Sequence, residues 1–181
     1  MSRSSTTIPF VGFAAFSGTG KTTLLRALIA HFASTAIRVA VIKHAHHDFD
    51  TDKPGKDSYE LRAAGASEMI VSSSRRRAHV VELPSDGPET TLSELLELPD
   101  PRRTDLILVE GFKTASIPKI ELHRPRLGKP LLATQDSNVI AVASDAPLTL
   151  PRGIVALDLN DAPQIAAFIR RTVIAQATSH R

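Results

Sequence analysis

Short apolar runs of strand length recur along this chain, and stretches with helically spaced apolar residues separate several of them. Such runs, bounded by glycine, proline or charged residues, are typical of buried strands. Strands are expected over residues 8–16, 37–45, 68–74, 77–83, 104–111, 117–124, 138–145 and 153–159. Helices are expected from residue 21 to about residue 33, from a capping box at Asp57 and Glu60 to Gly65, over residues 91–98, and from Asn160, as N-cap, toward the C-terminus.

The order of these elements predicts an α/β fold with a mostly parallel central sheet. Residues 8–45 read as strand, loop, helix and strand, and a connection through a helix joins parallel strands. The run between Asp105 and Glu110 is continuously apolar, as expected for a strand covered on both faces. Residues 68–83 read as a β-hairpin, which we expect at or beyond the edge of the sheet. We expect a single domain over residues 1–181, with a flexible tail at residues 1–7.

Composition narrows the class of protein further. A chain of 181 residues, 42% of them hydrophobic, can bury one core. Its 22 Lys and Arg residues against 19 Asp and Glu residues give a net charge of only +3, which does not by itself predict a nucleic-acid partner. The absence of cysteine excludes disulfides and thiolate metal sites. No apolar run is long enough for a signal peptide or a membrane span. We therefore expect a soluble, cytoplasmic protein with neither nucleic acid nor a membrane as partner.

The sequence SGTGKTT, residues 17–23, joins the first expected strand to the first expected helix and is typical of a phosphate-binding loop. Ala15 replaces the first glycine of the usual pattern, at a position that begins the turn and does not touch phosphate. Gly18 and Gly20 let backbone N–H groups converge on phosphate oxygens. The Lys21 ammonium suits the β and γ phosphates, and the Thr22 hydroxyl suits Mg²⁺. The residues expected to bind a nucleoside triphosphate here are Ser17, Gly18, Thr19, Gly20, Lys21, Thr22 and Thr23.

Glu110, at the end of the strand expected over residues 104–111, is the expected acidic partner of this loop. Phosphate loops work with a carboxylate that orients Mg²⁺ and the attacking group. We therefore assign catalytic roles to Lys21 and Glu110, and metal binding to Thr22 and Glu110. A strand-end acid that faces solvent is the alternative interpretation. Asp105, at the opposite end of the strand, is expected to be structural.

The segment KHAHHDFDTDKPGKDS, residues 43–58, follows the second expected strand at the sheet edge where ligands bind in open α/β sheets. A calcium loop is excluded because Lys53 and Tyr59 stand where that motif needs Gly and Glu. A zinc site of three histidines lacks an evident fourth ligand, and a solvated loop is also open. We favour a switch-like segment, flexible at Gly55, that closes over the γ-phosphate, the metal or a second anionic ligand. Its expected ligand contacts are His44, His46, His47, Asp48 and Lys56.

Three weaker signals leave alternatives open. Arg75–Arg77 is a lid that clamps phosphates, part of a face that binds nucleic acid, or a solvated hairpin tip. Asp136 and Asp145 lie beside apolar runs and either accept hydrogen bonds from a purine or are ordinary loop residues. No N-K-x-D tetrapeptide is present, so the motifs do not indicate which base the site prefers.

Four sequence segments, taken in their order along the chain, resemble a known family. They are GFAAFSGTGKTTLL, VIKHAHHDFDTDKPGKDSYELRAAGA, DLILVEGFK with PKIEL, and VIAVASD. Together they resemble the molybdopterin-guanine dinucleotide biosynthesis protein B (MobB) family. The resemblance extends from about Val11 to the last expected helix, except for residues 75–103, where no family motif aligns.

This resemblance implies a three-layer P-loop NTPase fold, a homodimer, and GTP that is bound with Mg²⁺ and hydrolysed weakly. The implied role is that of an adapter beside the guanylyltransferase that joins GMP to molybdopterin, with molybdopterin itself as a further candidate ligand. Residues His44–Ser58 match the signature loop of the family, and Glu110 with Gly111 matches its strand-end acid and turn. Two other classes stay open: a P-loop kinase or ligase acting on a small molecule, and a regulator that binds nucleic acid.

Overall fold

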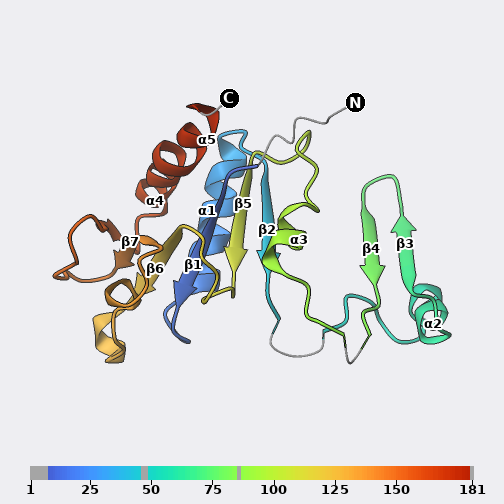
Figure 1. Cartoon of the computed structure of the whole chain (residues 1–181). Helices are drawn as coiled ribbons and strands as arrows, with labels where there is room; N and C mark the ends of the chain where they lie inside the picture. Colours follow the sequence, from blue (N-terminus) through green and yellow to red (C-terminus); the bar gives the residue numbers. More distant parts are fainter. Residues whose placement is uncertain (1–7, 46–48, 85–86, 180–181) are drawn as a thin grey trace. The chain divides into compact units, whose positions relative to one another are not determined.

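The computed structural model describes residues 8–45, 49–84 and 87–179, and the chain divides into two compact units (Figure 1). The larger unit contains the chain up to residue 44 and from residue 91 onward, and the smaller unit contains residues 45–90. The expected single domain over residues 1–181 stays a prediction. The expected tail at residues 1–7 lies outside the described residues.

A parallel sheet of six strands forms the larger unit, in the order β2-β5-β1-β6-β7-β8. Because every neighbouring pair is parallel, the carboxyl ends of all six strands lie at one edge, where α/β proteins bind ligands. The strands are β1 (Phe10–Ala15), β2 (Val39–Lys43), β5 (Leu106–Glu110), β6 (Lys119–His123), β7 (Val139–Ser144) and β8 (Val155–Asp158).

Helices cover both faces of this sheet, which gives three layers. Successive side chains of β5 point to opposite faces, so Leu106 and Leu108 join one core cluster while Ile107 and Val109 join another. The first cluster packs against α1 (Lys21–Ser34) and α4 (Ala162–Ile169), and the second includes leucines of α3 (Leu92–Leu96). The remaining helical segments are the 3₁₀ turns Pro125–Leu127 and Leu132–Thr134, a π-helical turn at Arg170–Ile174, and α5 (Ala175–Ser179). The predicted P-loop α/β fold is confirmed.

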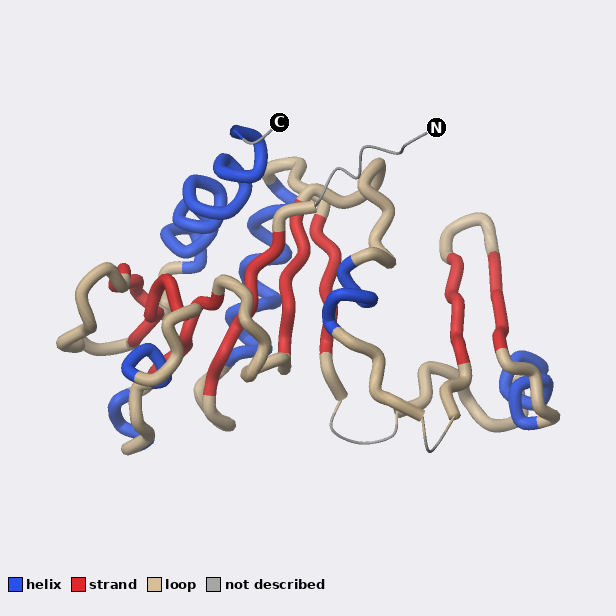
Figure 2. Tube along the Cα trace, in the orientation of Figure 1, coloured by secondary structure: helices blue, strands red, loops and turns tan. Residues whose placement is uncertain are grey.

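The smaller unit holds the predicted hairpin. Strands β3 (Glu68–Ser72) and β4 (Arg77–Val81) pair antiparallel as a sheet of their own, as Figure 2 shows, and α2 (Asp57–Ala63) precedes them. The guanidinium of Arg62 on α2 donates to Asp50 at 2.7 Å and to Glu82 at 2.5 Å. This one side chain therefore ties the segment before α2 to the segment after β4.

The predicted capping box of α2 is wrong. The N-cap is Lys56, which makes no side-chain capping bond, and Glu60 instead accepts a hydrogen bond from the backbone N–H of Gly55 at 3.1 Å. The Glu60 carboxylate is thus held by the bend before the helix. The larger unit has a complete capping box at Thr91 and Glu94, ahead of α3, which the sequence reasoning missed.

The predicted N-cap of α4 is also wrong by one residue. The carboxylate of Asp161 accepts a hydrogen bond from the Gln164 N–H at 2.8 Å and caps the helix. Asn160 lies in the preceding turn, because its own N–H donates to the carboxylate of Asp158 at 2.8 Å. Pro163 occupies the first turn of α4 as predicted. Among the described residues, no helix has the length and apolar character needed to cross a membrane.

Candidate functional site

The loop between β1 and α1 lies at the carboxyl end of the sheet. Gly18 and Gly20 have φ angles of 80° and 97°, a region that favours glycine, and Gly20 directly precedes α1. The N-terminus of this 14-residue helix therefore opens at the loop, where its free N–H groups and dipole favour an anion. Thr19 is buried, and its hydroxyl donates to the carbonyl of Phe16 at 2.7 Å. The loop is thus braced from inside, while Ser17 and Gly18 are exposed.

The two predicted catalytic residues meet beside this loop. Lys21 is the first residue of α1 and Glu110 is the last residue of β5, and Nζ lies 3.3 Å from Oε1. Both side chains are mostly shielded, at 20% and 14% exposed. Thr22 and Thr23 follow in the first turn of α1 and are exposed. The structure therefore brings a cation, a carboxylate and a hydroxyl-bearing helix start to the same loop.

His44 is placed next to Glu110 by the pairing of β2 with β5. Its backbone N–H donates to the Glu110 carbonyl at 2.9 Å, and its ring centroid lies 5.2 Å from that of Phe112. Gly111 makes this contact possible, because its φ is 101° and a Cβ there would lie 2.8 Å from the Cβ of His44. Among the predicted contacts of residues 43–58, His44 alone is described in the larger unit.

The structure does not test the other predicted contacts of that segment. His46, His47 and Asp48 lie outside the described residues. Lys56 belongs to the smaller unit, where it is exposed and precedes α2. Within the described part of the chain, no group of three or more His, Asp or Glu side chains could hold a metal ion. The switch-like role of residues 43–58 stays a prediction.

The basic turn of the smaller unit forms the tip of the β3–β4 hairpin. The Ser73 hydroxyl accepts hydrogen bonds from the backbone N–H groups of Arg75 and Arg76, at 3.3 and 3.1 Å. Arg77 pairs with Ser72 at the start of β4. The three arginines are exposed, which agrees with a solvated tip.

Arg124, which follows β6 directly, is a site residue that the sequence reasoning missed. Its Nε donates to the carbonyl of Thr19 at 2.8 Å, and its Nη1 donates to Oδ2 of Asp145 at 2.5 Å. One guanidinium thus links the phosphate loop to the end of β7. Its position after a strand, at the ligand-binding edge, is the signal that could have identified it.

Two exposed lysines also approach the phosphate loop. The ammonium groups of Lys113 and Lys129 lie 5.7 and 6.0 Å from the ring centroid of Phe16, within the range of cation–π attraction. They come from segments far apart in the sequence, after β5 and after β6. Together with Lys21 and Arg124 they give the surroundings of the loop a positive character that suits phosphate.

Buried charges on β6 hold the segment that joins β6 to β7. Glu121 is fully buried and accepts hydrogen bonds from the backbone N–H groups of Leu132 and Ala133 at 2.9 and 2.8 Å. The buried Lys119 donates to Oδ2 of Asp136 at 2.5 Å, and the backbone and side chain of Asn138 donate to its Oδ1. Both oxygens of Asp136 are therefore occupied, which makes it a structural loop residue.

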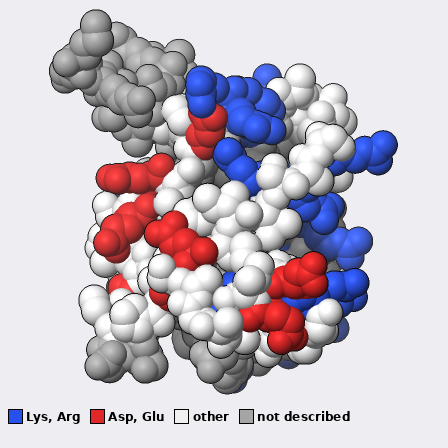
Figure 3. All heavy atoms as spheres, turned by 90° about the vertical axis from the view of Figure 1, so that its right-hand side faces the viewer, with Lys and Arg blue, Asp and Glu red and all other residues white. Residues whose placement is uncertain are grey.

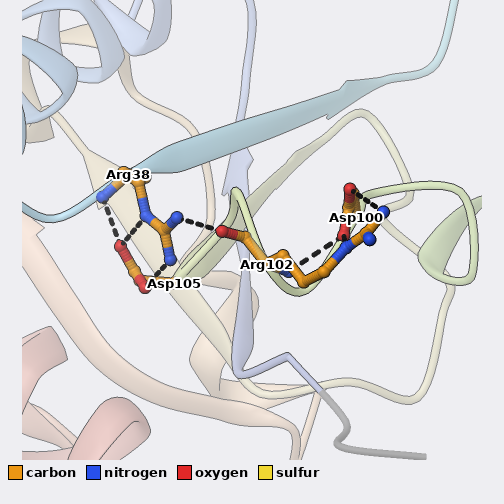
Figure 4. A network of polar contacts seen from close by, with 4 residues as sticks. All are labelled: Arg38, Asp100, Arg102 and Asp105. Carbon is orange, nitrogen blue, oxygen red and sulfur yellow. Dashed lines mark hydrogen bonds and ion pairs between the residues drawn. The ribbon is translucent and has the colours of Figure 1, made fainter.

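Asp105 lies at the opposite, amino edge of the sheet and is structural, as predicted. The Arg38 guanidinium donates two hydrogen bonds to this carboxylate, from Nε at 2.8 Å and from Nη2 at 2.7 Å. It also donates to the carbonyl of Arg102 (Figure 4). These hydrogen bonds lower the pKa of the Asp105 carboxyl to about 2. These hydrogen bonds join the segments that lead into β2 and β5, at the edge of the sheet opposite Glu110.

A parallel sheet with a glycine-rich loop between its central strand and first helix, and with a lysine paired to a strand-end carboxylate, defines a P-loop nucleotide-binding protein. The family model described as "Molybdopterin guanine dinucleotide synthesis protein B" matches residues 10–145. The chain belongs to this family, MobB, as the resemblance indicated.

Individual relatives agree with this assignment. The chain is 52% identical to the molybdopterin-guanine dinucleotide biosynthesis adapter protein of Escherichia coli, over 91% of this chain and 93% of that protein. It is 46% identical to the Haemophilus influenzae protein of the same name, over 90% and 88%. The solved structure of Bacillus subtilis MobB superposes with a TM-score of 0.69 at 22% identity, over 92% of this chain and 98% of that one, which supports the fold.

Proposed function

We propose that this protein is a GTP-binding adapter in the biosynthesis of molybdopterin guanine dinucleotide, with at most weak, Mg²⁺-dependent GTP hydrolysis. The observation that carries the proposal is the 52% identity to the Escherichia coli adapter protein across nearly the whole of both chains. Similarity of this extent includes the segments that form the phosphate loop and the carboxyl edge of the sheet. It favours an adapter over a small-molecule kinase or ligase, because neither of the two compared relatives carries the name of such an enzyme.

The residues at the loop fit a Mg²⁺-bound triphosphate. The N-terminus of α1 offers N–H groups to phosphate oxygens, and the Lys21 ammonium adds a positive charge at the same place. Thr22 and Glu110 offer the oxygen ligands that Mg²⁺ prefers. Bound Mg²⁺ would neutralise negative charge that develops on the phosphate oxygens. With a triphosphate bound, Lys21 would pair with phosphate in place of Glu110, and the Glu110 carboxylate would then be available to hold Mg²⁺ and to orient water.

The proposal extends to partners. An adapter acts by association, and we expect the guanylyltransferase of the pathway, a second copy of this chain and molybdopterin as its partners and further ligand, in the cytoplasm. Nucleic acid is a weaker candidate, because the net charge of the chain is only +3. The face drawn in Figure 3 carries both basic and acidic side chains.

The test is Mg²⁺-dependent GTP binding by Lys21→Ala. Loss of a charged hydrogen-bond donor to phosphate should weaken GTP binding by about tenfold to a hundredfold, measured by isothermal titration calorimetry. Arg26→Ala is the matched control, since it removes an exposed cation from the same helix further from the loop, and it should bind GTP as the unchanged protein does. Equal GTP affinity in the Lys21 variant would overturn the proposed site.

The adapter role is tested with the same two variants. Each protein is passed over immobilised guanylyltransferase with and without GTP and molybdopterin, and retention is measured. We expect nucleotide-dependent retention of the unchanged protein and of Arg26→Ala, and reduced retention of Lys21→Ala. Absence of association under all conditions would count against an adapter while leaving nucleotide binding intact.

A further inference from the structure

Three segments that are far apart in the sequence meet at the ring of Phe16, the half-buried residue that follows β1 and begins the phosphate loop. The ammonium group of Lys113 lies 5.7 Å from the ring centroid, and that of Lys129 lies 6.0 Å from it. β1 lies between β5 and β6 in the sheet (Figure 1), and the two lysines follow those two strands. The carboxyl ends of three adjacent strands therefore bring one aromatic ring and two cations together.

Short turns hold the backbone of the two lysines at this edge of the sheet. Just after β5, the N–H of Lys113 donates to the carbonyl of Gly111 at 2.9 Å. After β6, the N–H of Gly128 donates to the carbonyl of Pro125 at 3.0 Å and closes the turn that directly precedes Lys129. Both lysine side chains are exposed. Each ammonium group is thus carried to the Phe16 ring by an ordered turn and stays open to a ligand from solvent.

The positive charge at this ring is not balanced by the residues that the structure describes. Lys21 and Arg124, the other two cations beside the loop, each form an ion pair with a carboxylate. In the described part of the chain, neither Lys113 nor Lys129 has such a partner. Two positive charges near one ring repel each other, and the attraction of an exposed ammonium group to an aromatic ring is weak. A ligand with two negative charges would offset this repulsion.

The two lysines lie on the side of the loop where the proposed nucleotide would place its terminal phosphate. Glu110, the proposed partner of Mg²⁺, and Lys113 follow the same strand and are separated only by Gly111 and Phe112. The carbonyl of Phe16 accepts the hydrogen bond from the Thr19 hydroxyl, so the ring is attached to the braced backbone of the loop. An anion held by the lysines would therefore lie beside the nucleotide rather than within the loop.

We propose that Phe16, Lys113 and Lys129 form a second ligand site beside the nucleotide, which takes the phosphate monoester group of a small organic molecule. The inference rests on the proposed function, because the nucleotide defines which side of the loop the second ligand faces. A phosphate monoester carries a charge between about −1.5 and −2 near neutral pH, and lysine binds phosphate as a point charge. The flexible four-carbon stems let both ammonium groups converge on one phosphate. The Phe16 ring adds apolar surface, which favours an organic phosphate over inorganic phosphate.

The test uses phenyl phosphate as the probe, on protein saturated with Mg²⁺ and a non-hydrolysable GTP analogue so that the phosphate loop is occupied. Isothermal titration calorimetry measures the affinity. We expect the unchanged protein to bind phenyl phosphate more tightly than methyl phosphate, which lacks the ring, and more tightly than benzoate, which carries a single charge. Lys113→Ala and Lys129→Ala should each weaken the binding of phenyl phosphate by about tenfold, because each removes a charged donor to phosphate.

Arg126→Ala is the matched control. It removes an exposed cation from the 3₁₀ turn that precedes Lys129, and it should bind phenyl phosphate as the unchanged protein does. Lys113→Arg keeps the charge and should retain most of the affinity. Absence of phenyl phosphate binding by the unchanged protein, or the same affinity in the two lysine variants, would overturn the second site. An equal loss in Arg126→Ala would also overturn it, since overall charge would then account for the effect.

Binding of the GTP analogue separates this inference from the proposed function. Its affinity should be the same in the unchanged protein, Lys113→Ala and Lys129→Ala, because these lysines are assigned to the second ligand. Loss of analogue affinity in these variants without a change in phenyl phosphate affinity would assign the lysines to the nucleotide and overturn the second site alone. Failure of the unchanged protein to bind the analogue would instead overturn the proposed function.

Discussion

At the scale of single residues, a buried carboxylate on β6 holds the turn that follows it. Glu121 accepts hydrogen bonds from the backbone N–H groups of Leu132 and Ala133 and is fully buried. We expect Glu121→Ala to lower the free energy of unfolding by about 2 to 4 kcal/mol, because two buried donors lose their acceptor. Chemical denaturation measures this change.

Glu121→Gln is the matched control for this prediction. Its amide oxygen can accept from one of the two donors, so its loss of stability should be smaller than that of the Ala variant. If Glu121→Ala unfolds at the same denaturant concentration as the unchanged protein, the turn at Leu132–Thr134 is not held by this carboxylate.

At the scale of elements, the start of α4 offers a test of one helix cap against its neighbour. Asp161 caps the helix through Gln164, whereas Asn160 lies in the turn before it. We expect Asp161→Ala to lower the free energy of unfolding by about 1 kcal/mol, and Asn160→Ala to leave it nearly unchanged. Thermal or chemical denaturation measures the stability of the two variants. A larger loss of stability in Asn160→Ala than in Asp161→Ala would show that Asn160 is the N-cap.

At the scale of the whole molecule, strongly hydrogen-bonded carboxylates predict a loss of stability in acid. Hydrogen bonds from Arg38 lower the pKa of Asp105 to about 2, and hydrogen bonds from Arg102 lower the pKa of Asp100 to about 2, against an ordinary value of 3.8. As the pH falls, the unfolded chain therefore binds protons before the folded one does. The stability linked to these groups is complete above about pH 4 and is lost between about pH 4 and pH 2.

The measurement is the melting temperature at a series of pH values from neutral to about 3. We expect Arg38→Gln to lower the melting temperature near neutral pH and to make its fall in acid shallower, since the folded and unfolded forms of Asp105 then titrate more alike. An identical acid profile in the variant would show that the clamp of Arg38 on Asp105 is not linked to folding.

The elements and the phosphate loop could be predicted from the sequence because each depends on nearby residues. Apolar periodicity sets a strand or a helix, and Gly18, Gly20 and Lys21 create the loop through their own conformational freedom and charge. Helix caps were less predictable, because the residues expected to cap form other hydrogen bonds in an adjoining bend. The Glu60 carboxylate accepts from the Gly55 N–H, and the Asn160 N–H donates to Asp158. The sequence does not show which charges of β6 are buried, and Glu121 is fully buried.

The sequence by itself determined the class of fold, the phosphate-binding loop and the family. The spacing of nearby residues carries the first two, and the long segments that resemble the MobB family carry the third. Only the tertiary structure decided which charges are buried, that Lys119 and Asn138 occupy both oxygens of Asp136, and that Arg124 reaches both Thr19 and Asp145. These facts depend on the order β1-β6-β7 in the sheet. That order brings together residues more than 100 positions apart in the chain, such as Thr19 and Arg124, and no local pattern records it.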